Sequence, residues 1–99
     1  VKHVILWKLK EELTAEEKEN VKAGRKAGLE GLAGKIPGLV DVKVNINGLP
    51  TSTVDVMLDT TFTDADALKA YSTNPLHVAV ADGKVRPYTA VRSCLDYEV

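Results

Sequence analysis

Apolar and polar residues alternate in four separate stretches of this chain, and alternation with a period of two is typical of β-strands. The clearest stretch runs from Val40 to Asn47, where every second residue is valine or isoleucine and the residues between them are polar. The predicted strands cover residues 2–9, 40–47, 54–62 and 89–99. Signals that begin helices fall between the first two strands and again between the last two. The predicted order is therefore strand, helix, strand, strand, helix, strand.

Capping signals set the predicted helix boundaries. Thr14-Ala15-Glu16-Glu17 has the hydroxyl and the carboxylate of a capping box, so a helix should begin there. We expect that helix to continue to about Lys35 and to end before Pro37, because proline cannot extend it. A second cap signal, Thr63-Asp64-Ala65-Asp66, begins the other helix. Asn74-Pro75 interrupts this helix, and one or two further turns should follow, since proline is accepted at a first helical position.

The βαββαβ order predicts an α+β fold of the ferredoxin-like class, in which two helices cover one face of a four-stranded antiparallel sheet. A chain of 99 residues makes one such domain and leaves nothing to cover the other face. Val4 and Leu6 are candidates for that open face, and Val91, Leu95 and Tyr97 share one face of the last strand. Apolar groups on an open sheet favour pairing with a second copy, so we expect a face-to-face homodimer.

The charge and cysteine content exclude several classes of protein. The formal net charge is -1 and no run of Lys or Arg stands out, which argues against a nucleic-acid partner. No apolar stretch is long enough to cross a membrane, and Lys8 and Lys10 interrupt the first apolar segment, unlike the core of a secretion signal. The single Cys94 excludes an internal disulfide, so we expect a cytoplasmic protein. No phosphate, dinucleotide or paired metal motif is present, and we expect neither a cofactor nor a metal.

Three glycines, Gly24, Gly28 and Gly31, form a stripe along the first predicted helix. Each costs the helix roughly 1 kcal/mol relative to alanine, so their presence needs a reason. One interpretation is close packing of the helix on the sheet, or a helix that the glycines weaken. The other is a cavity wall, where missing side chains leave room for a ligand, and this makes Gly28 a candidate ligand-binding residue.

Two residues around the break at Pro75 have the chemistry of a small active site. His77 can move a proton in either direction near neutral pH, and Tyr71 can donate a hydrogen bond to an oxygen that gains negative charge. His3 shares a strand face with Ile5 and Trp7 that should point toward the helices. We therefore take His77 and Tyr71 as candidate catalytic residues, and His3 and Trp7 as candidate ligand contacts. The structural alternative is that His77 braces the helix break and Tyr71 is a core aromatic with its hydroxyl at the surface.

Two further residues are expected to have structural roles. Arg25 lies in an apolar arc of the first helix and should extend its charged end to water. Cys94 has no base near it in the sequence and is expected to be a buried structural thiol.

Three segments resemble the stress-responsive A/B barrel domain (Dabb) family. They are the opening Lys2-His3-Val4-Ile5-Leu6-Trp7-Lys8-Leu9-Lys10, the central Ile36-Pro37-Gly38, and Tyr71-Ser72-Thr73-Asn74-Pro75-Leu76-His77-Val78. The closing Leu95-Asp96-Tyr97 fits as well, so the resemblance covers residues 1–99 as a single Dabb domain. It implies a dimeric α/β barrel.

One branch of the family, plant polyketide cyclases similar to olivetolic acid cyclase, uses a tyrosine and a histidine in an aldol-type ring closure. Those residues match Tyr71 and His77, and a first-strand histidine matches His3. The stripe of glycines departs from the bulkier first helix of the cyclases, so the substrate does not carry over.

Three functions remain open on the sequence. The first is a Dabb protein that binds a small apolar or aromatic molecule between helices and sheet, in a stress response, without chemistry of its own. The second is a cyclase or lyase that uses His77 as base and Tyr71 as hydrogen-bond donor. The third is a purely structural dimer whose barrel is filled.

Overall fold

The sheet and its helices follow the predicted order. A computed structural model describes all of residues 1–99. The strands are β1 (Lys2–Leu9), β2 (Leu39–Asn45), β3 (Val56–Phe62) and β4 (Thr89–Tyr97), and the helices are α1 (Ala15–Glu30), α2 (Ala65–Thr73) and α3 (Pro75–Val80). A π-helical turn (Ala81–Val85) and a 3₁₀ turn (Arg86–Tyr88) lead from α3 into β4. No helix combines the length and the apolar character that crossing a membrane requires.

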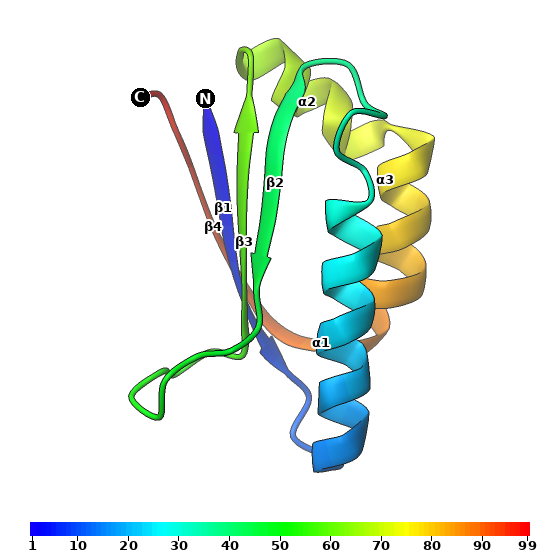
Figure 1. The fold of residues 1–99 in the computed structure, drawn as a ribbon, viewed down its shortest axis with the longest axis vertical. Helices are drawn as coiled ribbons and strands as arrows, with labels where there is room; N and C mark the ends of the chain where they lie inside the picture. The colour runs from blue at the N-terminus through cyan, green and yellow to red at the C-terminus, as the bar shows by residue number, and fades with distance from the viewer.

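The four strands form one antiparallel sheet in the order β2-β3-β1-β4, and all three helices lie on the same side of it (Figure 1). This is the ferredoxin-like arrangement that the element order predicts. β1 is central, so a residue on it has a partner on both sides: His3 lies opposite Thr60 of β3 and opposite Asp96 of β4. β4 forms an edge of the sheet.

The core lies between the sheet and the helices. Its strand residues alternate along β1, β2 and β3 and are buried on the helix-facing side, as the period of two requires. They pack against residues of α1, α2 and the turns that follow these helices. The buried cluster comprises Ile5, Trp7, Leu29, Leu32, Ile36, Leu39, Val42, Val44, Val56, Leu58, Phe62, Tyr71 and Val85.

The opposite face of the sheet has no cover within the chain, and it has apolar side chains on β1 and β4. Leu6 is 37% exposed, Val91 54%, Leu95 65% and Tyr97 43%. Val4 lies opposite Leu95 in the same register and is half-buried. Val4 and Leu6, the two residues predicted for the open face, are therefore on that face, and Val91, Leu95 and Tyr97 share it.

Helix α1 ends earlier than predicted, at Glu30 instead of about Lys35. The capping box at Thr14 is present, with Glu17 N–H donating to the Thr14 hydroxyl and Thr14 N–H donating to the Glu17 carboxylate. At the other end Gly31 caps the helix and tight turns follow, in which Leu32 N–H donates to Leu29 O and Lys35 N–H to Leu32 O. Gly34 adopts φ 77°, a left-handed conformation that glycine accepts at little cost, and this takes the chain out of the helix.

The predicted alternation in the second strand fails at its first residue. Leu39 is buried and Val40 is 61% exposed, because an irregularity in the pairing with β3 falls between Leu39 and Asp41. Such a bulge adds one residue to one strand and shifts the alternation by one position. The third strand begins at Val56 instead of residue 54, since the Asp55 carboxylate accepts a hydrogen bond from Leu9 N–H just before it.

Candidate ligand-binding site

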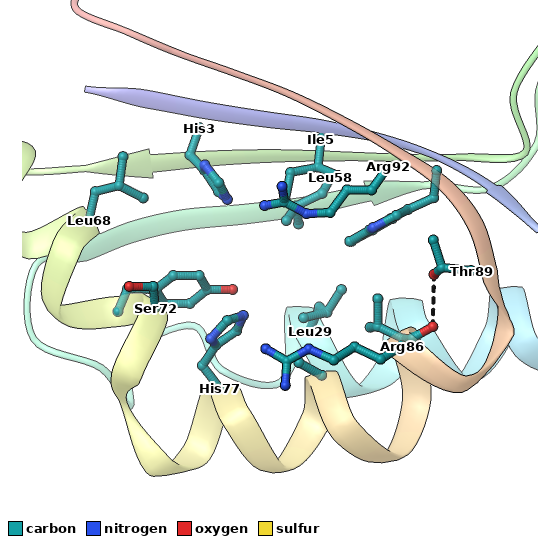
Figure 2. A pocket seen from close by; sticks show the side chains of 14 residues that line it. His3, Ile5, Leu29, Leu58, Leu68, Ser72, His77, Arg86, Thr89 and Arg92 are labelled. Atoms are coloured by element: carbon teal, nitrogen blue, oxygen red, sulfur yellow. Dashed lines mark hydrogen bonds between the residues drawn. The ribbon is translucent and has the colours of Figure 1, made fainter.

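A pocket of about 400 Å³ lies between the helix-facing side of the sheet and α2, α3 and the turns that follow α3 (Figure 2). This volume lies within the range of ligand sites in proteins. The residues that line it include His3, Trp7, Tyr71 and His77, which are four of the five candidates taken from the sequence. Its apolar wall comes from Ile5, Leu29, Leu58, Leu68, Ala81 and Val85.

The helix break at Pro75 places Tyr71 and His77 beside each other. The Asn74 side chain accepts from Leu76 N–H and so caps α3, while Pro75 occupies the first turn, where its missing N–H is not needed. Tyr71 is in the last turn of α2 and His77 in the first turn of α3. Their ring centroids are 4.0 Å apart with a 32° angle between planes. The two predicted catalytic side chains therefore form a contact pair on one wall of the pocket.

Tyr71 is only 2% exposed, yet its hydroxyl has no hydrogen-bond partner. Burial raises the pKa of Tyr71 to about 12, so the hydroxyl is a neutral donor at any physiological pH. The ring also packs edge-on against Phe62 at 5.0 Å and against His3 at 6.2 Å between centroids. The ring is thus packed against Phe62 and His3, and its hydroxyl is buried without a partner in a residue that lines the pocket.

His77 is half-buried, and its Nδ1 is buried without a partner. Burial lowers the pKa of His77 and outweighs the opposing effect of the Ser72 backbone, and the nearby charge of Arg86 acts in the same direction as burial. The imidazole is therefore mostly neutral at pH 7 and has a free lone pair, which is the state required of a general base.

His3 is fixed by β4. The β1–β4 register places Asp96 opposite His3, and the Asp96 carboxylate accepts a hydrogen bond from His3 Nδ1. A carboxylate on Nδ1 leaves the lone pair of the neutral ring on Nε2. Burial acts to raise the pKa of Asp96, but the hydrogen bonds from His3 and Cys94 and the charge of Arg92 outweigh it and hold that pKa below its ordinary value. The His3 ring points from the sheet toward the pocket (Figure 2).

His3, Cys94 and Asp96 are also the group that could hold a metal ion, since one ligand atom from each lies within 4.8 Å of the others. Cys94 Sγ donates to Asp96 Oδ1 at 3.4 Å and lies 3.7 Å from His3 Nδ1. Burial raises the pKa of the Cys94 thiol, and the neighbouring Asp96 carboxylate adds to this effect, so the neutral thiol is favoured over the thiolate that binds metal. Cys94 is exposed, which corrects the expectation of a buried structural thiol, because β4 is an edge strand.

The expectation that Arg25 reaches water is wrong: it is fully buried. Its guanidinium lies 5.0 Å from the centre of the Trp7 ring and donates to Val85 O and to the Thr89 hydroxyl. These hydrogen bonds connect α1 to the last residue of the π-helical turn and to the first residue of β4. Burial lowers the pKa of Arg25 to about 10, which still leaves it charged at neutral pH, and its Nη1 has no partner.

The remaining candidates differ in their placement. Trp7 is 3% exposed and lines the pocket, and its Nε1 has no hydrogen-bond partner. Gly28 lies outside the pocket lining: a Cβ there would meet Val80 Cγ1 at 3.1 Å, and one at Gly24 would meet Lys84 Cδ at 3.6 Å. The contact at Gly28 therefore supports close packing of α1, but against α3 and not on the sheet as expected, while the contact at Gly24 would be an ordinary one.

Three charged residues in or beside the site were not predicted as site residues: Arg86 and Arg92 line the pocket, and Asp96 binds His3 next to it. Asp96 and Arg92 alternate with Val91, Leu95 and Tyr97, which the sequence places together on one face of the last strand. That alternation is a signal that could have placed Asp96 and Arg92 on the side of the helices. The position of Arg86 could not be predicted in this way, because it follows a π-helical turn for which the sequence contains no recognisable pattern.

Comparison with known proteins gives both a family and solved structures of the same fold. The family model described as "Stress responsive A/B Barrel Domain", Dabb, matches residues 1–99. No match was found among curated proteins.

A dimeric protein of unknown function with a ferredoxin-like fold from Bacteroides fragilis is 34% identical, with a TM-score of 0.92 over 99% of this chain and 94% of that one. A Dabb family protein from Mesorhizobium loti is 16% identical, with a TM-score of 0.74 over 99% and 94% of the two chains. The hydroxynitrile lyase of Passiflora edulis is 15% identical, with a TM-score of 0.71 over 97% and 89%. The last two likenesses show the fold alone.

Proposed function

Because the chain belongs to the stress-responsive A/B barrel domain (Dabb) family, whose model spans residues 1–99, we propose that it binds a small, largely apolar or aromatic molecule between helices and sheet. The observation that carries this proposal is the pocket itself. It has a volume of about 400 Å³ and an apolar wall, and three of the residues that line it, Trp7, Tyr71 and His77, each have a buried polar atom without a hydrogen-bond partner.

Unpartnered buried polar atoms favour a ligand over a filled barrel. A buried donor or acceptor without a partner costs about 1–3 kcal/mol, and native proteins keep few of them. Three such atoms beside one cavity have a common explanation if a bound molecule supplies the missing partners. A purely structural dimer would gain stability by filling the space with side chains.

Acid–base catalysis is the second candidate function. Its support is the packing of the Tyr71 and His77 rings, whose centroids are 4.0 Å apart. In addition, burial lowers the pKa of His77, so the neutral imidazole is able to accept a proton. Tyr71 would donate a hydrogen bond to a substrate oxygen on which negative charge develops. A cyclase or a lyase reaction would use this pair. A hydroxynitrile lyase has the same fold, but at 15% identity it does not identify the reaction.

We also propose that two copies pair through the open sheet face. The Bacteroides fragilis protein of the same fold is described as dimeric, as are two further neighbours. The apolar side chains of Leu6, Val91, Leu95 and Tyr97 would be covered in such a pair. A cytoplasmic location is supported by the single free cysteine, and a role in stress response by the family's description only.

Thermal denaturation in the presence of a panel of small phenols and aromatic ketones tests the binding function. A compound that fits the pocket should raise the melting temperature of the parent protein, because it binds the folded state alone. His77→Gln should reduce this shift, whereas Lys35→Gln, an exposed residue outside the pocket, should leave it unchanged. If shifts are equal in all three proteins, the ligands bind elsewhere and the site assignment is wrong.

Catalysis is tested with the compounds that bind. Tyr71→Phe should lower kcat more than it raises KM, because the hydroxyl would stabilise charge that develops in the transition state. Unchanged turnover in both Tyr71→Phe and His77→Gln would remove the catalytic hypothesis and leave the binding function in place.

A further inference from the structure

Three of the polar side chains that line the pocket can only donate hydrogen bonds, namely Trp7 and the guanidinium groups of Arg86 and Arg92. The imidazoles of His3 and His77 and the hydroxyls of Ser72, Tyr71 and Thr89 can accept as well as donate. No aspartate or glutamate lines the pocket. The two guanidinium groups therefore favour a ligand that has acceptor atoms and a negative charge.

We propose that the ligand has a carboxylate, which binds Arg92 and Arg86 at the edge of the pocket while its apolar body occupies the interior. This inference rests on the proposed binding function and specifies its ligand class. In Figure 2 Arg92 extends from the sheet side and Arg86 from the helix side, and both side chains reach the space that His77 borders. Both arginines are exposed, as residues at the opening of a pocket are.

Arg92 is the stronger of the two anchors. It lies on β4 opposite Trp7 and has no carboxylate within salt-bridge distance, although its charge acts on the nearby Cys94 and Asp96 side chains. Its guanidinium fork can therefore still take a planar bidentate partner. Arg86 is paired with Asp82 one helical turn before it, on the surface. The other carboxylate of the region, Asp96, is engaged by His3. The carboxylates nearest to the pocket are therefore already in use.

The charge of Arg25 acts in the same direction. Its guanidinium is fully buried behind the wall, against Trp7 and Thr89, which both line the pocket. No carboxylate is within salt-bridge distance of it. Two arginines and no acid line the pocket, and the Arg25 guanidinium lies behind its wall. Asp82, Asp55 and Asp96 offset part of this positive charge, because they interact with Arg86, Arg25 and Arg92 respectively. Such a site attracts and orients anions.

A carboxylate with an apolar tail fits both halves of the site. Guanidinium groups bind carboxylates in the geometry of two parallel hydrogen bonds, and the aliphatic side chains of Ile5, Leu29 and Leu58 form the interior wall. A volume of about 400 Å³ accepts a compact aromatic or medium-chain acid. The guanidinium groups would thus select the carboxylate of the ligand, and the aliphatic wall would select its apolar body.

Matched acid and amide pairs test this inference, because they share shape and differ in charge. Each pair, for example 3-phenylpropionate with 3-phenylpropionamide and hexanoate with hexanamide, is titrated into the protein by calorimetry and by NMR at low salt. The acid should bind at least about tenfold more tightly than the amide, as expected when a hydrogen-bonded ion replaces a neutral group. Added salt should reduce that preference, since the arginines are exposed.

Three variants separate the contributions. Arg92→Gln should reduce the preference for the acid to about twofold and leave amide affinity unchanged. Asp82→Asn should increase the preference, because it frees Arg86. Lys35→Gln removes one positive charge outside the pocket and should change nothing.

If acid and amide bind equally, the pocket is a site for neutral molecules, and the carboxylate inference is wrong while the binding function stands. If the acid preference persists in Arg92→Gln, the charge is recognised elsewhere and the inference is also wrong. If a panel of pairs produces no binding to a folded protein, the proposed function fails and this inference fails with it.

Discussion

Replacing Tyr71 with phenylalanine should make the folded protein more stable. A buried tyrosine usually loses stability on this change, because its hydroxyl has a hydrogen-bond partner. Here the hydroxyl is buried without a partner. Such a group costs about 1–3 kcal/mol of desolvation, and phenylalanine fills the same ring volume without that cost. We expect the free energy of unfolding to rise by about 1 kcal/mol, the low end of this range, because the adjoining cavity can admit water.

The measurement is denaturation by urea and by heat, at one protein concentration for all variants so that association affects them equally. A gain of about 1 kcal/mol corresponds to a rise of roughly 4–8 °C in Tm for a domain of this size. Tyr88→Phe is the matched control: Tyr88 is partly exposed, and its change should stay within about 0.5 kcal/mol. A loss of 1 kcal/mol or more in Tyr71→Phe would refute the reasoning, since it would mean that the hydroxyl has a stabilising partner. The same variant should bind pocket ligands more weakly, which would separate the role of the hydroxyl in binding from any role in folding.

Three more predictions concern the dimer, the pH dependence and the buried arginine. Leu6→Lys should convert the proposed dimer to a monomer in light scattering, because it puts a charge into the sheet-to-sheet interface, and a stable dimer would contradict the proposed face. His77 should titrate below 6.5 in NMR. The free energy of unfolding should therefore fall as the pH drops from about 6.5 toward the lowered pKa, since the unfolded chain takes up the proton more readily, and a slope that His77→Gln leaves intact would count against this origin. Arg25→Ala should cost about 2–4 kcal/mol in denaturation, and Arg25→Met less, because methionine keeps the packing against Trp7; equal losses would show that the hydrogen bonds dominate.

The order of elements could be predicted from the sequence because its signals are local. The capping box at Thr14, the cap at Asp64 and the break at Pro75 depend only on neighbouring residues, and each is present in the structure. The end of α1 was misplaced because apolar spacing continues past Gly31, although the backbone has already left the helix. The bulge that turns Val40 outward depends on pairing with β3, which no local pattern reveals.

The candidate site could be predicted in part. Tyr71, His77, His3 and Trp7 line one pocket, because strand alternation and the helix break both orient side chains in a readable way. The arginines could not be placed. Arg25 can be buried because it donates hydrogen bonds to the carbonyl of Val85 and the hydroxyl of Thr89, which are about 60 residues away in the sequence. Whether a charged side chain is buried depends on such long-range partners, and a local pattern does not reveal them.

Strand β4 has two faces with different tasks. Val91, Leu95 and Tyr97 lie on the face where a second copy would pack, and Arg92, Cys94 and Asp96 lie on the face toward the pocket. Because residues of one edge strand lie in both the proposed interface and the binding site, a shift of β4 would change both of them. Linkage then makes the two reciprocal: if assembly tightens ligand binding by some factor, the ligand must tighten assembly by the same factor. If the coupling is positive, dilution of the protein would release ligand, and ligand would protect the dimer against dilution.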